Sequence, residues 1–319
     1  MTTNDSSPSA LVQELHRIPE ADALALVDQH FGPPEGWPSE LIAYRLGSSF
    51  QTDWKIELGQ WLKAADQHGF LEKVMKDVRD QAKRPVKHQT SGIDPNDRRH
   101  LKLHHHLAVA RIVHYLTATG WSFKSIESET GGPIDIDCSL IAPGNQLVEF
   151  QVKAPDRPGR RDGYHHVDGD NDKDVIKAVD KARKQLRNPA TGPALVGICA
   201  NRSRSLAWEP DCLITHLVGS TIETRRGVFL EKARTGEFFT DKWKHVSGLL
   251  LIDLLRGEVE AKYTCTVLAN PLATFPISPE WFPKGRVCVL DDKTFRWIRG
   301  QPGIRHGLSN GVQLVEQLP

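Results

Sequence analysis

The feature that most constrains the fold is a β-hairpin predicted at residues 134–153. Residues 134–141 and 147–153 alternate between apolar and polar side chains, a pattern that is typical of half-buried strands. The sequence Pro-Gly-Asn at 143–145 lies between them and favours a tight turn. Two strands joined this closely pair antiparallel, so the middle of the chain is expected to belong to a sheet.

Polar side chains follow one face of each predicted hairpin strand. Side chains two residues apart on a strand point the same way, so Asp135 and Asp137 share a face of the first strand. Glu149, Gln151 and Lys153 share a face of the second strand. Polar groups on half-buried strands are costly unless something compensates them, and a divalent cation with oxygen ligands does so. The hairpin therefore predicts a Mg²⁺ or Mn²⁺ site, unless its polar rows are simply a solvated face.

The elements around the hairpin follow a definite order. Residues 101–119 have helical spacing, and a short strand at 121–127 precedes the two hairpin strands. A helix over 175–187 and a buried type of strand at 194–200 come next. This order of helix, three strands, helix and strand predicts an α/β (α+β) fold.

The same segment carries a motif in two halves, Gly-Pro-Ile-Asp at 132–135 and Gln-Val-Lys at 151–153. Together with the element order, these residues resemble the PD-(D/E)xK nuclease superfamily, and the glutamine is similar to the Mrr-like branch of restriction endonucleases. The resemblance implies a restriction-endonuclease-like core with a mixed sheet. It also implies a Mg²⁺- or Mn²⁺-dependent endonuclease that hydrolyses phosphodiester bonds, with Asp135 and Gln151 as metal ligands and Lys153 as the catalytic lysine.

The sequence departs from the family pattern in three places. A second aspartate follows the first, so Asp137 is a metal ligand in place of Asp135 or together with it. Glu149 lies on the same face as Gln151 and is a further candidate ligand. The first helix lacks the glutamate that many family members use, and Glu127 or Glu129 is a possible substitute.

Basic side chains near the predicted site are candidates for contacts to a phosphate backbone, which position a nucleic acid without reading its bases. The polar side of the second helix carries Lys177, Lys181, Lys184 and Gln185. The loop after the hairpin carries Arg157, Arg160 and Arg161. Both sets are also compatible with ordinary solvated surfaces. The family resemblance favours DNA over RNA as the partner and suggests a role in bacterial defence or restriction.

The predicted domain organisation has four parts. Helical spacing at 10–16, 21–30, 54–66 and 70–83 indicates a helical N-terminal domain over 1–88. A basic segment at 89–99, interrupted by Gly92 and Pro95, is expected to link it to a nuclease-like domain at 100–270. A C-terminal extension rich in proline and glycine covers 271–319. We expect the N-terminal domain to bind a regulatory protein, a target or a second copy of the chain.

Bulk composition limits the cellular setting. The formal net charge is +1, so any basic surface must be local. Five scattered cysteines without a CxxC pair argue against a disulfide framework and a zinc site. Neither a signal peptide nor a membrane-spanning run is recognisable, which predicts a cytoplasmic protein without a membrane partner.

Two other functions are compatible with parts of the sequence. A glutamine at position 151 removes one charge from the metal site, so the fold could instead be a catalytically degenerate module that binds nucleic acid or a partner protein. Arg99 and His104 have the Arg-x4-His spacing of the helical HEPN ribonucleases. The strand-rich middle of the chain disfavours that third hypothesis.

Overall fold

The fold was obtained as a computed structural model of the whole chain. It describes residues 10–31, 51–82, 88–89, 92–93, 99–128, 134–154, 169–200, 211–218, 221–223, 229–232, 236–253, 265–290 and 295–297. These residues divide into two compact units, one formed by the described residues up to Phe123 and the other by those from Lys124 onward. We describe each unit by itself.

The first unit is helical and contains the four helices predicted for the N-terminal region. Its helices are α1 (Ala10–Leu15), α2 (Glu20–Phe31), α4 (Gln51–Gln67), α5 (Leu71–Ala82) and α6 (Arg99–Ala118), with the short strands β1 (His88–Gln89) and β2 (Gly92–Ile93) between the last two. Helix α6 packs against α4 and α5. The predicted first helix of the nuclease-like domain therefore groups with the N-terminal helices.

Helices α2 and α4 approach each other closely at Gly59. A Cβ atom at this position would lie 2.3 Å from the carbonyl oxygen of Ala23. That distance is far below van der Waals contact, so the absence of a side chain is what allows the two backbones to meet. Leu58 and Leu62 on α4 are fully buried beside this contact.

A buried polar cluster joins α4 to α6. The Arg111 guanidinium lies over the rings of Trp61 and Tyr115, at 5.2 and 5.7 Å from their centroids. The hydroxyl of Tyr115 donates to Oε2 of Glu57 at 3.3 Å. Burial raises the pKa of Glu57 to about 7, while the Arg111 charge and the Tyr115 hydrogen bond act in the opposite direction. A glutamate in this place is held largely protonated below neutral pH.

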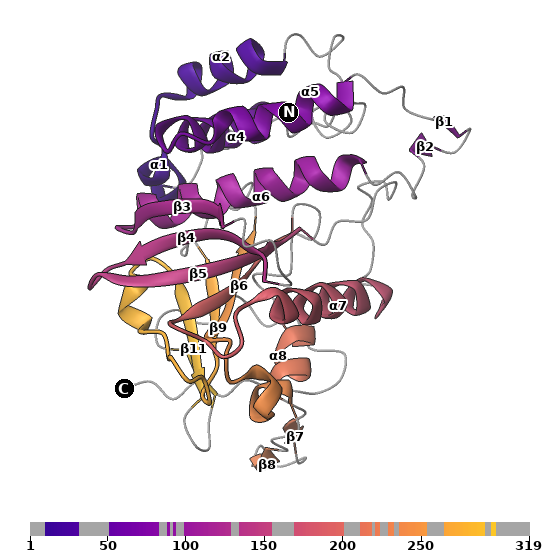
Figure 1. Cartoon of the computed structure of the whole chain (residues 1–319), viewed down its shortest axis with the longest axis vertical. Coiled ribbons are helices and arrows are strands. Elements are labelled where there is room, and N and C mark those ends of the chain that lie inside the picture. The colour runs from indigo at the N-terminus through magenta and orange to yellow at the C-terminus, as the bar shows by residue number, and fades with distance from the viewer. Residues whose placement is uncertain are drawn as a thin grey trace, which may run out of the picture. The chain divides into compact units, whose positions relative to one another are not determined.

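The second unit is built on a mixed sheet (Figure 1). Among the described residues, eight strands form it in the order β12-β11-β10-β9-β6-β5-β4-β3. Its strands are β3 (Ser122–Ser128), β4 (Ile136–Ala142), β5 (Gln146–Lys153), β6 (Ala194–Ala200), β9 (Gly248–Asp253), β10 (Thr266–Ala269), β11 (Arg286–Leu290) and β12 (Phe295–Trp297). The pair β4–β5 is antiparallel, whereas β5–β6 and β6–β9 are parallel. The fold is thus α/β with a mixed sheet, as the sequence predicts.

One face of the sheet is covered by helices α7 (Gly169–Gln185) and α8 (Asp211–Val218) and by the 3₁₀ turns η2 (Glu237–Phe239) and η3 (Asp241–Trp243). Alternate strand residues such as Val196 and Leu249 form one hydrophobic cluster with Val179 of α7 and with Leu186, which directly follows that helix. Val175, Val179 and Leu186 are buried in this cluster, whereas the neighbouring Ile176 is half-buried. The short hairpin of β7 (Thr221–Glu223) and β8 (Phe229–Lys232) forms a separate sheet.

The hairpin and the strands around it follow the prediction closely. Gly144 and Asn145 have φ values of +90° and +66° in the turn between β4 and β5, a conformation that glycine and asparagine adopt most readily. Strands β11 and β12 lie beyond residue 270 and continue the sheet of the predicted nuclease-like domain. The predicted boundaries at 88, 99 and 270 stay predictions. No described helix is long and apolar enough to cross a membrane.

Candidate active site

Strands β4 and β5 part at Asp137. Their ladder runs from the pair Ala142–Gln146 to the pair Cys138–Phe150. At the next step, Oδ2 of Asp137 accepts the backbone N–H of Val152 at 2.5 Å. The side chain of Asp137, rather than a backbone carbonyl of β4, therefore accepts this N–H of β5. Asp137 is 2% exposed.

Asp135 lies outside the strand and belongs to a different environment. Its backbone N–H donates to the carbonyl oxygen of Gln185 at 3.0 Å, at the last residue of α7. Its Oδ2 accepts from the side-chain Nε2 of Gln185 at 2.7 Å. The sequence predicted a strand from residue 134, but the bond to α7 draws Asp135 away, and β4 begins at Ile136. One aspartate is thus buried and the other is exposed.

Gln151 is fully buried on the face of β5 that lies beside α7. Its side chain is 0% exposed, and neither Oε1 nor Nε2 finds a hydrogen-bond partner among the described residues. A buried amide without partners costs about 1–3 kcal/mol. Such a group in a folded protein points to a ligand that would complete it.

Lys153 lies at the end of β5, two residues beyond Gln151, and is half-buried. Burial lowers the pKa of its ammonium group, the charges of Asp137 and Asp135 raise it, and the charge of Lys181 lowers it. The charges of both aspartates and of one lysine of α7 therefore act on the ammonium group of Lys153.

Glu149 has a fixed cationic partner. Its Oε1 lies 2.7 Å from Nε of Arg187, just after α7, and both side chains are mostly buried. The sequence proposed Glu149 as a further metal ligand, and in the structure this oxygen is already neutralised by the guanidinium. That metal role stays a prediction. Sequence reasoning did not assign a role to Arg187, because nothing in its local pattern names a partner 38 residues away.

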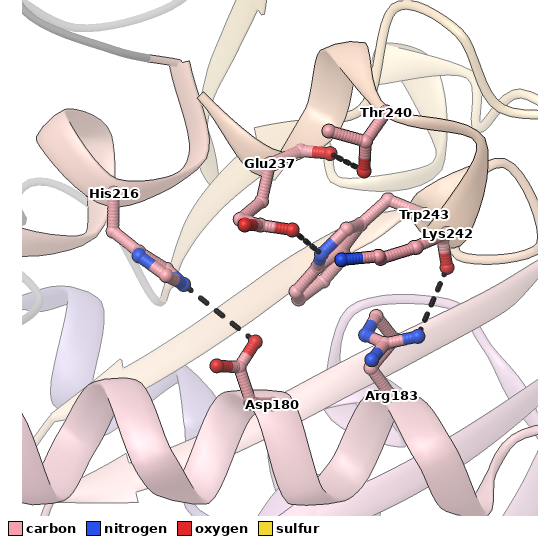
Figure 2. A network of polar contacts seen from close by, with 7 residues as sticks. All are labelled: Asp180, Arg183, His216, Glu237, Thr240, Lys242 and Trp243. Atoms are coloured by element: carbon pink, nitrogen blue, oxygen red, sulfur yellow. Dashed lines mark hydrogen bonds and ion pairs between the residues drawn. The ribbon is translucent and has the colours of Figure 1, made fainter. Parts of the chain in front are cut away.

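Helix α7 ends at Gln185, which binds Asp135, and the helix is itself anchored by contacts with other segments (Figure 2). Nη1 of Arg183 donates to the carbonyl oxygen of Lys242 at 3.1 Å, and its guanidinium lies 5.5 Å from the centroid of Trp243. The indole N–H of Trp243 donates in turn to Oε2 of Glu237 at 3.1 Å. These contacts tie the last turns of α7 to η2 and η3.

Two further contacts add to this anchoring. Asp180 forms an ion pair with His216 of α8, with 3.6 Å between Oδ1 and Nε2 (Figure 2). The imidazole Nε2 of His245 lies 3.0 Å from the carbonyl oxygen of Arg183, one of the last carbonyls of α7. The helix that positions Gln185 and Arg187 is therefore held by side chains from three other segments.

The remaining predicted contacts divide by location. Lys177 and Lys181 are exposed on α7, as predicted. The amide of Gln185 donates to Asp135, so this side chain has a partner within the protein. Glu127 lies in β3. Four residues with predicted roles lie outside the described residues: Glu129, Arg157, Arg160 and Arg161.

The donor atoms around Lys153 were tested for their fit to a divalent cation. Within the described ranges, no group of three or more His, Cys, Asp and Glu side chains is arranged to hold a metal. The available set is mixed: the buried carboxylate of Asp137, the unpartnered amide of Gln151 and the Asp135 oxygen that Gln185 does not bind. Carboxylate and amide oxygens suit Mg²⁺ and Mn²⁺, and the orphaned amide is the observation that favours a bound cation.

Comparison with known proteins adds no relative. The chain matches no protein-family model, no curated protein and no solved structure.

Proposed function

We propose that the chain is a metal-dependent nuclease that hydrolyses phosphodiester bonds. The observation that carries the proposal is the buried amide of Gln151, which has no hydrogen-bond partner among the described residues and lies two residues before Lys153 on β5. A second support is the order α6, β3, β4, β5, α7, β6, in which β4–β5 is antiparallel and β5–β6 is parallel. That order agrees with a restriction-endonuclease-like core, which we propose as the finer description of the fold.

Asp137, Gln151 and Asp135 would hold a Mg²⁺ or Mn²⁺ ion. When bound, the ion would supply Lewis-acid polarisation of a phosphoryl oxygen and would acidify a water molecule. Lys153 orients the attacking water with its ammonium group and stabilises the negative charge that develops on the phosphorus oxygens. The hydrogen bond from Val152 keeps the Asp137 carboxylate in one orientation. The side chains of this set therefore position the reacting groups before the substrate arrives.

The proposed substrate class is supported by the exposed lysines of α7, one of which, Lys181, lowers the pKa of Lys153 by its charge. Lys177 and Lys181 are exposed one helical turn apart on α7, and they can contact successive phosphates of one strand. We propose a nucleic acid, DNA rather than RNA, as the substrate, and bacterial defence as the setting. Cleavage and binding should weaken as salt is raised.

The test is a cleavage assay on supercoiled plasmid, linear duplex DNA and RNA, with Mg²⁺, Mn²⁺ or EDTA. Lys153→Met is compared with Lys124→Met, which removes an exposed lysine of β3. We expect the wild type and Lys124→Met to cleave with either metal. Lys153→Met should lose at least about 100-fold in rate, the usual effect of removing one group that stabilises developing charge. Undiminished cleavage in EDTA or by Lys153→Met would refute the proposal.

A second function is favoured by the hydrogen bonds of the two aspartates. Asp135 and Asp137 each already accept an N–H, and the described residues include no three-acid metal cluster. A degenerate module that binds nucleic acid, or a partner protein, without cutting would have these features. Salt-dependent gel shifts of DNA together with no cleavage under any metal would support it over the nuclease.

A further inference from the structure

The last residue of α7 holds Asp135 by two bonds. The backbone carbonyl of Gln185 accepts the Asp135 N–H at 3.0 Å, and the Gln185 side chain donates to Oδ2 at 2.7 Å. The first bond places the backbone of Asp135, and the second sets the orientation of its carboxylate. Oδ1 has no hydrogen-bond partner within the described ranges.

The position is an unusual one for an anion. The carbonyl groups at the C-terminal end of a helix carry a partial negative charge, which disfavours a nearby carboxylate and favours a cation. Asp135 nevertheless lies at this end of α7, with the buried carboxylate of Asp137 nearby in the sequence. Two carboxylates and a negative helix end together form a region that a cation stabilises.

We propose that Gln185 is a positioning residue, which turns the Asp135 carboxylate so that Oδ1 is available to a bound divalent cation. The inference rests on the proposed nuclease function, because it assigns a role toward the metal of that same site. A donor that orients a metal-binding carboxylate commonly changes metal affinity by about 10- to 100-fold. The Gln185 side chain acts through Asp135 and does not touch the reacting atoms.

The side chain can be removed without removing the backbone anchor. In Gln185→Met, the side chain keeps its length but cannot donate a hydrogen bond, whereas the carbonyl that receives the Asp135 N–H is unchanged. Gln146→Met is the matched control, since Gln146 is an exposed glutamine at the opposite end of the β4–β5 hairpin. Thermal unfolding of both variants is measured first to establish that they fold like the wild type.

The experiment titrates the full-length protein with Mn²⁺ and follows the free ion by electron paramagnetic resonance, without nucleic acid. We expect Gln185→Met to raise the Kd for Mn²⁺ about 10-fold, while Gln146→Met and the wild type agree. DNA binding in EDTA, measured by fluorescence anisotropy, should be the same for Gln146→Met and the wild type. Gln185→Asn, which can still donate but is shorter, should recover part of the Mn²⁺ affinity.

The outcomes separate the two proposals. A wild type that binds Mn²⁺ and cleaves DNA, with an equal Kd in Gln185→Met, overturns the positioning role and leaves the nuclease intact. Equal weakening by Gln146→Met also overturns it, because the effect would then not depend on the contact with Asp135. A wild type that neither binds Mn²⁺ nor cleaves overturns the proposed function, and the positioning role with it.

Discussion

Replacing Glu57 by glutamine should change how the stability of the protein depends on pH. Glu57 is buried between α4 and α6, and burial raises its pKa from 4.5 to about 7 in the folded protein. Glutamine keeps the size of the side chain and an oxygen that can accept from the Tyr115 hydroxyl. The substitution therefore removes the titration with little change in packing.

The size of the effect follows from the two pKa values. Below pH 4.5, Glu57 is protonated in both the folded and the unfolded chain and contributes no pH dependence. As the pH rises above 4.5, the unfolded chain releases the proton first, so the free energy of unfolding falls by about 1.4 kcal/mol per pH unit. The loss ends above pH 7, where both states are ionised, and it amounts to about 3 kcal/mol in total.

Urea unfolding followed by circular dichroism at pH 5 and at pH 8 measures this difference. Between pH 5 and pH 8 the wild type should lose about 2.5 kcal/mol more than Glu57→Gln, because the unfolded chain has already released part of the proton at pH 5. The variant should thus be the more stable protein at pH 8. Glu72→Gln, at an exposed glutamate of α5, is the control and should follow the wild type. Parallel pH profiles for Glu57→Gln and the wild type would show that Glu57 is not held protonated by burial.

Two further predictions concern close packing and buried hydrogen bonds. Gly59→Ala should destabilise the helical unit by about 1–3 kcal/mol, because the new Cβ would meet the Ala23 carbonyl oxygen at 2.3 Å. The higher helix propensity of alanine would by itself stabilise the unit, so a raised Tm for Gly59→Ala would contradict the packing argument. Asn270 is 3% exposed and donates to the carbonyls of Trp243 and Val246 at 2.9 and 2.8 Å. Asn270→Ala should lower the free energy of unfolding in urea by about 2–3 kcal/mol. Asn270→Asp should lower it further, because a carboxylate would face two carbonyl groups. Equal stability of the two variants would contradict this account of the Asn270 hydrogen bonds.

The candidate site was predictable in part because strand periodicity is local. Alternation along 134–141 and 147–153, with a turn between, is enough to place Asp137 beside the end of β5. The same rule placed Asp135 on the strand, and there it was wrong. A carbonyl at the end of α7, 50 residues away, binds the Asp135 N–H, and no local pattern in the sequence contains that contact.

In the helical unit, too, local spacing predicted the helices but not the contacts between them. Spacing of apolar residues predicted helices close to the observed α2, α4 and α5. It did not indicate that Glu57 and Arg111 are buried together, since charged residues are usually assigned to the solvated face of a helix. Their burial depends on which helices pack together, and the contact between α4 and α6 decides it.

The amino-acid sequence by itself determined the kinds of elements and their order, the hairpin at its centre and the polar row on β5, because these depend on periods of two and of 3.6 residues. Only the tertiary structure decided which polar groups have partners. Gln151 has no partner among the residues that the structure describes, Glu149 is paired with Arg187, and Asp135 is held by Gln185. Hydrogen-bond partners come from segments distant in the chain, and burial, which makes each unpaired group costly, is a property of the packed whole.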